Sequence, residues 1–308
     1  MIVVFGSLNI DMVMQLDKMP RPGETVLCPN YQLISGGKGA NQAIAAANTG
    51  ASVKLFGKVG QDEFGRIVMA SLKKTSVDLV GVSESQAAST GCAAIYVDKQ
   101  GENIIAVASG ANLEAREDEI PDYLLSHETT LLVQMETPAE ENWKLIRRAK
   151  KYGARVLLNL APAYPIPEDI FPHLDVLILN QVEAALLALE LHFEVISPLV
   201  VPRRLAARYG ITCIVTLGKQ GSIACSPDGT WEVKAMDVQV VDTTAAGDAF
   251  VGVLAASLDT GMDLPLALRR ASVASGLACL HKGAQASLPT NRQIEENLKQ
   301  VMVPRRTG

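Results

Sequence analysis

Short apolar runs alternate with amphipathic segments between residues 130 and 216, and this alternation restricts the fold more than any other feature. The runs TLLVQM, RVLLNL, DVLILN and TCIVTLG have the length and composition of buried strands. The segments AEENWKLIRRAKKYG, EAALLALEL and VPRRLAARYG among them have the 3.6-residue period of helices. Because such helices supply the crossovers between parallel strands, the pattern predicts βαβ units and a parallel sheet covered by helices.

Two early groups of strand-like runs form hairpins rather than βαβ units. IVVFGSLNI reads as one buried strand, and ETVLCPNYQLIS as two short strands around a Pro29-Asn30 turn. CAAIYVDKQGENIIAVA reads as a hairpin that turns at Lys99-Gln100-Gly101-Glu102. We therefore expect one doubly wound α/β domain over residues 1–308. Its mostly parallel sheet lies between helices, and segments at about 12–35 and 90–108 form a small β lid.

Composition argues against several classes of function. The chain has 308 residues, 48% of them hydrophobic, which suits one large α/β domain. A net charge of −5 without a long basic run argues against a nucleic-acid partner, and no apolar run has membrane-spanning length. The first 14 residues lack a basic region and contain Asn9 and Asp11, so no signal peptide is expected. Five scattered cysteines, none spaced C-x-x-C, predict small buried thiols in a reducing compartment.

The segment DTTAAGDAF, residues 242–250, combines small residues with an acid at a helix start. The apolar residues that follow form one helical stripe, so the helix begins near Gly247. Its first N–H groups lack helical partners, and its dipole is positive at this end. Ala245, Ala246 and Gly247 leave room at the backbone, which predicts a pocket for a phosphate. Asp248 is then either a base for a hydroxyl that attacks phosphorus or an acid that only stabilises the helix end.

A second glycine-rich element, SGGKGANQA at residues 35–43, is either a ligand loop or a plain strand-to-helix turn. Its glycines permit close backbone approach, and Lys38 between them favours a polar ligand. GKGANQ has Gln42 where a dinucleotide fingerprint has its third glycine, and no P-loop motif is present. Asn9 and Asp11 are two residues apart after the first strand, so both can point to one face and bind a polyhydroxyl compound.

GGKGANQA and DTTAAGDAF resemble the two signatures of the ribokinase-type (pfkB) carbohydrate kinases. Further ordered motifs, GSLNID, PRPGETV, GENIIAVASGAN, LNLAPA, TLGKQGS and KGAQASLP, extend the resemblance over almost the whole chain. It implies a doubly wound α/β sandwich with a β lid that often forms a dimer contact, and hence a homodimer. It also implies a cytoplasmic enzyme that phosphorylates D-ribose at O5, with ATP, Mg²⁺ and a monovalent cation, K⁺ foremost.

The resemblance also implies roles for individual residues. Asp248 would be the catalytic base, and Ala245, Ala246 and Gly247 the anion hole. The sugar would be held by Asn9, Asp11, Gly37, Lys38, Gly39, Asn41, Glu136 and Asp248. ATP would contact Asn180, Glu183, Thr216, Leu217, Gly218, Lys219, Gln220, Gly221, Gly247, Asp248 and Ser272, where NQVE matches an N-x-x-E motif linked to magnesium and phosphate. The monovalent cation would lie at Asp242, Thr244, Ala278, His281, Gly283 and Ser287.

Two departures from the family pattern and three alternatives stand beside this interpretation. Ser272 occupies a position where a larger polar side chain is common, and residues 184–202 are unusually apolar. The first alternative is a related sugar or nucleoside kinase, although an aromatic content of 5% offers little to bind a nucleobase. The second is a non-catalytic sugar or nucleotide sensor, against which Gly247 and Asp248 argue. The third is a dehydrogenase.

Overall fold

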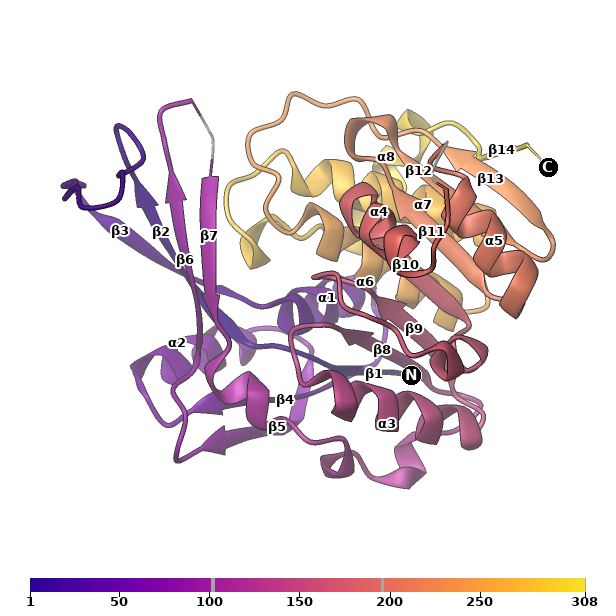
Figure 1. Cartoon of the computed structure of the whole chain (residues 1–308), viewed down its shortest axis with the longest axis horizontal. Helices are drawn as coiled ribbons and strands as arrows, with labels where there is room; N and C mark the ends of the chain where they lie inside the picture. The colour runs from indigo at the N-terminus through magenta and orange to yellow at the C-terminus, as the bar shows by residue number, and fades with distance from the viewer. Residues whose placement is uncertain (101–102, 195–196, 308) are drawn as a thin grey trace.

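The structure is a computed structural model that describes residues 1–100, 103–194 and 197–307. Part of the expected turn at residues 99–102, and two residues of the apolar segment 184–202, lie outside the described residues. The chain forms a ten-stranded sheet between two layers of helices, and a separate four-stranded sheet that projects from one end of it (Figure 1).

The large sheet has the strand order β14-β13-β12-β11-β10-β9-β8-β1-β4-β5. Its strands are β1 (Ile2–Phe5), β4 (Val53–Gly60), β5 (Asp78–Ser85), β8 (Thr130–Gln134), β9 (Arg155–Asn159), β10 (Val176–Asn180), β11 (Thr212–Thr216), β12 (Ser222–Ser226), β13 (Gly229–Val233) and β14 (Arg305–Arg306). The strands from β11 to β5 are parallel, and the three at the other edge are antiparallel. This arrangement confirms the predicted mostly parallel sheet.

Alternate residues of the buried strands face two separate cores. Ile2 and Val4 face the core covered by α1 (Lys38–Ala47), α2 (Glu63–Leu72), α6 (Ala246–Asp259), α7 (Leu264–Ala278) and α8 (Asn291–Asn297). Val3 and Phe5 face the core covered by α3 (Ala139–Lys151), α4 (Gln181–Glu190) and α5 (Val200–Tyr209). The 3₁₀ helices are Gly110–Glu114, Glu117–Glu119, Asp122–Leu124, Glu168–His173, Gly218–Gln220, Gln285–Ser287 and Leu298–Gln300. Helices on both faces define the doubly wound α/β class.

The small sheet has the order β3-β2-β6-β7. Its strands are β2 (Asn9–Gln15), β3 (Tyr31–Gly36), β6 (Gly91–Val97) and β7 (Asn103–Ala108). The hairpin of β6 and β7 is the expected one. These strands begin and end within a few residues of the two segments expected for a lid.

Two expectations about these early strands are wrong. IVVFGSLNI is not one strand, because the chain leaves the large sheet after Phe5 and enters the small sheet at Asn9. ETVLCPNYQLIS contains only β3, because β3 pairs with β2 and leaves residues 24–28 without a ladder partner. Side chains there are correspondingly open to solvent, with Leu27 at 91% exposure.

Two findings concern the expected cellular environment. Among the described residues, none of the helices combines the length and the apolar character that crossing a bilayer requires. All five cysteines are free thiols, but only Cys213 and Cys225 are buried, so the expectation of burial holds for two of the five.

Helix α6 packs directly on α1, and Gly252 permits this contact. A Cβ at Gly252 would lie 2.5 Å from the Gln42 carbonyl oxygen and 2.7 Å from the Ala45 Cβ. We expect Gly252→Val to push the two helices apart and to lower the free energy of unfolding by about 1–3 kcal/mol, as overpacking does. Urea unfolding followed by circular dichroism measures this, and an unchanged midpoint would show that the helix contact tolerates the added volume.

Candidate active site

Asp248 lies in the first turn of α6 and is almost fully buried, with 8% exposure. Its two carboxylate oxygens accept hydrogen bonds from neighbouring amides of α1: Asn41 Nδ2 donates to Oδ2 at 2.9 Å, and Gln42 Nε2 donates to Oδ1 at 2.9 Å. Burial raises the pKa of Asp248, while Lys38 and the two amide donors oppose this rise. An acid held by amide donors from another helix does more than stabilise its own helix end.

The start of α6 leaves backbone donors unpaired beside this acid. Ala245 has a left-handed conformation, with φ of 59° and ψ of 8°. The Ala246 N–H donates to the Thr243 carbonyl at 3.2 Å. Within the described part of the chain, the N–H groups of Gly247 and Asp248 have no hydrogen-bond acceptor. A Cβ at Gly247 would meet no atom within 4 Å, so an anion could approach these two donors closely.

Several carboxylates surround the half-buried Lys38 at the start of α1. Burial alone would lower the pKa of the Lys38 ammonium, but Asp248, Glu136, Glu183 and Asp11 together raise it. Lys38 therefore stays charged at neutral pH. Burial also raises the pKa of Asp11, to about 6, and the negative charges of Glu136 and Asp248 add to this rise. Residues from β2, α1, the end of β8, α4 and α6 thus act on one another electrostatically.

Glu136 belongs to this cluster and accepts hydrogen bonds from a backbone donor and a side-chain donor. The Lys38 N–H donates to Glu136 Oε2 at 3.1 Å, and the Ser7 hydroxyl donates to the same oxygen. Ser7 Oγ in turn accepts from the Gly39 N–H at 3.3 Å. Gly37 precedes the helix with φ of 93°, which an L side chain rarely adopts. Sequence reasoning missed Ser7, although it stands in GSLNID, one of the motifs that carries the family resemblance.

Asn9 is oriented by a residue that sequence reasoning also missed, Asn112. Asn112 Nδ2 donates to Asn9 Oδ1 at 2.7 Å, and Asn112 Oδ1 accepts from the Leu8 N–H at 2.9 Å. Because the Asn9 oxygen is engaged by Asn112, its NH₂ group is the part left to donate to a ligand. A Cβ at Gly91 would lie 2.1 Å from Asn9 Oδ1, so this packing requires glycine. Asn112 stands in GENIIAVASGAN, one of the motifs that carries the family resemblance.

The residues expected to bind the nucleotide occupy loops at the carboxyl ends of β10 and β11. Asn180 and Glu183 form a capping box: Asn180 Oδ1 accepts from the Glu183 N–H at 2.9 Å, and Glu183 Oε2 accepts from the Asn180 N–H at 2.7 Å. Thr216 ends β11, and the turn Leu217–Gly221 follows it, closed by the Leu217 N–H on the Gly221 carbonyl at 2.7 Å. Gly218, Lys219 and Gln220 are exposed.

Ser272 differs from these residues because its hydroxyl is already engaged. It is buried on α7, and Ser272 Oγ donates to the Lys234 carbonyl at 2.8 Å. Its observed bond joins α7 to the segment after β13 rather than presenting a group to solvent.

Three of the residues expected around a monovalent cation are joined by hydrogen bonds. Asp242 Oδ1 accepts from the Thr244 N–H at 2.9 Å, and Asp242 Oδ2 accepts from the Gly283 N–H at 2.9 Å. Burial raises the pKa of Asp242, but these donors together lower it below its ordinary value. The Val241 N–H donates to the Cys279 carbonyl at 2.9 Å. This hydrogen bond places Ala278, the last residue of α7, near the segment that contains Asp242.

The side chains of the other two expected cation ligands do not join this group. The Ser287 hydroxyl donates to the Ala284 carbonyl at 2.8 Å, and His281 is exposed. Within the described ranges, no hydrogen bond joins either side chain to Asp242, and no group of three or more His, Cys, Asp or Glu could hold a metal ion.

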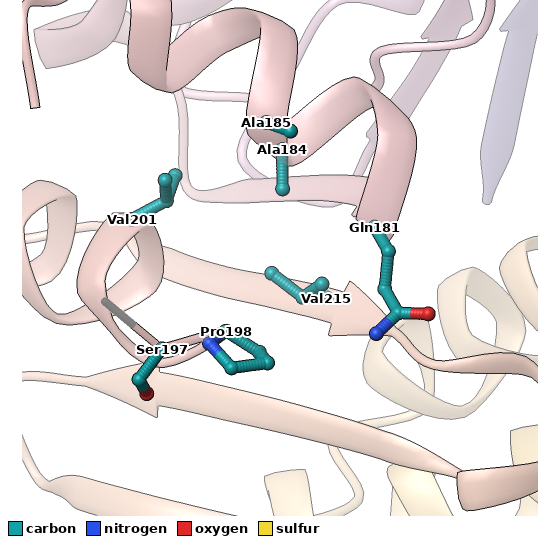
Figure 2. Close-up of a pocket in the computed structure, with 7 residues that line it drawn as sticks. All are labelled: Gln181, Ala184, Ala185, Ser197, Pro198, Val201 and Val215. Atoms are coloured by element: carbon teal, nitrogen blue, oxygen red, sulfur yellow. The ribbon is translucent and has the colours of Figure 1, made fainter. Parts of the chain in front are cut away.

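A cavity of about 320 Å³ lies between α4, α5 and β11, and none of its lining residues belongs to the cluster of carboxylates around Lys38 (Figure 2). Its lining is Gln181, Ala184, Ala185, Ser197, Pro198, Val201 and Val215. The cavity falls in the segment 184–202 that the sequence marks as unusually apolar. It contains none of the residues expected to bind sugar or nucleotide, although Gln181 and Val215 are chain neighbours of Asn180 and Thr216.

The chain belongs to the pfkB family of carbohydrate kinases, which residues 1–291 match. The ribokinase of Bacillus subtilis is 35% identical over 303 residues, which cover 96% of this chain and 99% of that protein. The deoxyribokinase of Salmonella typhi is 31% identical over 301 residues, 96% of this chain and 98% of that protein. The structure of Arabidopsis thaliana ribokinase complexed with ribose and ATP matches with a TM-score of 0.87 and 29% identity, over 97% of this chain and 98% of that one.

These comparisons confirm the predicted fold and the predicted class of enzyme, an ATP-dependent carbohydrate kinase. The dehydrogenase alternative is therefore wrong. The missing third glycine in GKGANQ was the sequence observation that argued against it.

The raised pKa of Asp11 generates a prediction about pH. Because its folded-state pKa of about 6 exceeds the ordinary aspartate pKa of 3.8, the folded state binds an extra proton between these values. The free energy of unfolding therefore falls as pH rises from 3.8 to about 6, by up to about 3 kcal/mol. We expect Asp11→Asn to raise stability at pH 7.5 and to flatten its pH dependence between pH 4 and 6. Urea unfolding across this range measures both, and a variant less stable than wild type at pH 7.5 would show that the charge is favourable there.

Proposed function

We propose that this enzyme transfers the γ-phosphoryl group of ATP to O5 of D-ribose in the cytoplasm, with Asp248 as the general base. One observation carries the proposal: a buried carboxylate, held by two amides, adjoins the unpaired N–H groups of Gly247 and Asp248. A hydroxyl placed between them would lose its proton to Asp248 while the N–H groups stabilise charge on the phosphoryl oxygens. The free thiols support a reducing compartment.

An unpaired polar atom and several polar side chains support binding of a sugar. Asn41 Oδ1 is buried and has no donor, which suits the hydroxyl hydrogen of a sugar. Asn9, Asp11, Lys38 and Glu136 supply further polar groups, and a small polyhydroxyl ligand satisfies such a set better than an apolar base does. Gly37 and Gly39 allow this loop to pack closely against the backbone of residues 6–9. Ribose is favoured over related sugars by the ribokinase relative, whereas the deoxyribokinase relative makes 2-deoxyribose the alternative.

The nucleotide and its ions fit the remaining loops. ATP would lie along Asn180, Glu183, Thr216, the turn Leu217–Gly221 and the start of α6. Mg²⁺ usually keeps several waters and binds through one or two carboxylates together with substrate phosphates, so a site with few protein ligands suits it. Bound Mg²⁺ would neutralise phosphate charge. Lys38, which stays charged, would do the same from the protein side.

The test is an assay that measures ADP release with a series of free sugars and nucleosides as phosphoryl acceptors. Asp248→Asn serves as the control that is expected to be inactive. We expect ribose to give the highest kcat/KM, above 2-deoxyribose, fructose 6-phosphate and adenosine. Asp248→Asn should keep the fold and sugar binding but lose about 10²–10⁴-fold in kcat, the usual contribution of a general base. Near-full activity of this variant would leave Asp248 with a structural role only, and a higher kcat/KM for 2-deoxyribose or a nucleoside would reassign the substrate.

We also propose activation by a monovalent cation, most effectively K⁺, near Asp242 and Thr244. The Asp242 carboxylate already fixes the chain before α6 to the Gly283 loop, so an ion bound by carbonyl oxygens there would further order the N–H groups of α6. Assays in tetramethylammonium buffer, with K⁺, Na⁺ or Cs⁺ added back, should give the highest rate with K⁺. A rate indifferent to all three ions would leave Asp242 as a hydrogen-bonded turn residue.

The small sheet is proposed to act as a lid and to form a homodimer. Asp11 pairs with Ala93, and Ala93 with Val107, so all three share one face of this sheet. Val107 and Ile105 on that face are 50% and 53% exposed, and β7 is an edge strand, which proteins normally cover.

We expect sedimentation velocity to give a dimer at micromolar concentration. Ile105→Lys, on the Asp11 face, should dissociate the dimer and raise KM for the sugar. Ile104→Lys, on the opposite face, is the matched control because Ile104 is equally exposed. A fully active monomer at micromolar concentration would contradict the proposed role of the lid.

A further inference from the structure

We propose that Gln42, fixed by Gln134 and Asn159, is a positioning residue that sets the orientation of the Asp248 carboxylate. The inference rests on the proposed role of Asp248 as the base, and it assigns a function to three buried amides that belong to neither the sugar site nor the nucleotide site. They lie on α1 and at the carboxyl ends of β8 and β9, behind Asp248.

The hydrogen bonds of Gln42 permit only one orientation of its amide. Gln42 Nε2 donates both hydrogens, to Asp248 Oδ1 at 2.9 Å and to Asn159 Oδ1 at 2.9 Å. Gln42 Oε1 accepts from Gln134 Nε2 at 2.7 Å. A flipped amide would place its oxygen against two other oxygens and its NH₂ group against the NH₂ group of Gln134.

At Asn159, this series of hydrogen-bonded amides is anchored to the backbone of a neighbouring strand. Asn159 Nδ2 donates to the carbonyl of Ile178 in β10, at 3.2 Å, which fixes the oxygen that Gln42 contacts. Gln42 and Gln134 are fully buried, and Asn159 is 7% exposed. Water therefore cannot readily replace these bonds, and the position of Asp248 Oδ1 follows from three adjacent strands of the sheet.

In the part of the chain that the structure describes, the charged groups that act on Asp248 are Lys38 on α1, Glu136 after β8 and Asp11 on β2. The partners behind it are neutral amides, so they favour the ionised carboxylate by donation without bringing a positive charge. Removal of the Gln42 donor should therefore disfavour the ionised form that a base requires.

The experiment compares Gln42→Met with wild type. Methionine keeps the length of the side chain but donates no hydrogen bond. We expect kcat for ribose to fall at least tenfold at pH 6.5, with KM for ATP changed less than twofold. The acid limb of the kcat profile should move to higher pH by about one unit, so the loss should shrink as pH rises toward 8.5.

Two further variants make the result decisive. Gln134→Met keeps the donation to Asp248 but frees the Gln42 amide to flip, and should shift the acid limb in the same direction by less. It also serves as the test if Gln42→Met does not fold. Asn48→Leu is the control, because it removes an amide at the end of the same helix that bonds the Leu288 carbonyl at 3.2 Å. It should lower stability and leave the pH profile unchanged. An unshifted acid limb in both glutamine variants would overturn the proposal.

A measurement without turnover separates this proposal from the proposed function. The ¹³Cγ signal of Asp248, assigned by its loss in Asp248→Asn, reports the pKa of this carboxyl directly. In Gln42→Met this pKa should rise by about one unit even if the enzyme uses an unexpected substrate. If wild type phosphorylates no sugar, the proposed function fails alone. If Asp248→Asn abolishes turnover but Gln42→Met changes neither pKa nor kcat, the positioning role fails alone.

Discussion

The close approach of helix α1 to backbone on both of its sides is the constraint on which the site depends. A Cβ at Gly39 would lie 2.5 Å from the backbone of Gly6 and Ser7, at the end of β1. On the opposite side, Gly252 of α6 leaves no room for a Cβ beside the Gln42 carbonyl. Because these two glycines lack a Cβ, α1 can approach both the end of β1 and α6 more closely than any larger residue would allow. Only then can the short amides of α1 reach a carboxylate on α6.

The same packing concentrates negative charge around a single cation. Asp11, Glu136, Glu183 and Asp248 all act on Lys38, and the pKa of Asp11 rises because its carboxylate is buried among like charges. Such an arrangement lowers the stability of the empty site, since each ionised carboxylate lacks a full counter-charge. A sugar donates several hydroxyl hydrogens to such groups, so it can satisfy them upon binding. Under the proposed function, the cost of burying these carboxylates and the affinity for a sugar would have the same physical origin.

Sequence patterns predicted the large sheet and the starts of α1 and α6, because these features depend on local signals. Apolar runs and helical periods fix strand and helix identity, and glycines beside polar residues mark α1 and α6. The division of IVVFGSLNI between two sheets was missed, because Phe5 and Asn9 stand in one strand-like run and only their pairing distinguishes them. Asn112 was missed for a similar reason: its contact with Asn9 joins residues more than a hundred positions apart. Gln134 and Asn159 did carry a signal, since each is a polar residue that ends an otherwise apolar strand.

The use of amides rather than cations behind Asp248 fits the demands on a base. A buried lysine or arginine at the position of Gln42 would hold the carboxylate equally firmly, but its full charge would depress the pKa of Asp248 and weaken it as a proton acceptor. An amide dipole fixes the geometry with a smaller effect on basicity, while burial works in the opposite direction and raises the pKa. Lys38, the cation of the cluster, lies on the open side, where a phosphoryl group can share its charge. The neutral amides therefore fix the orientation of this carboxylate while lowering its pKa less than a buried cation would.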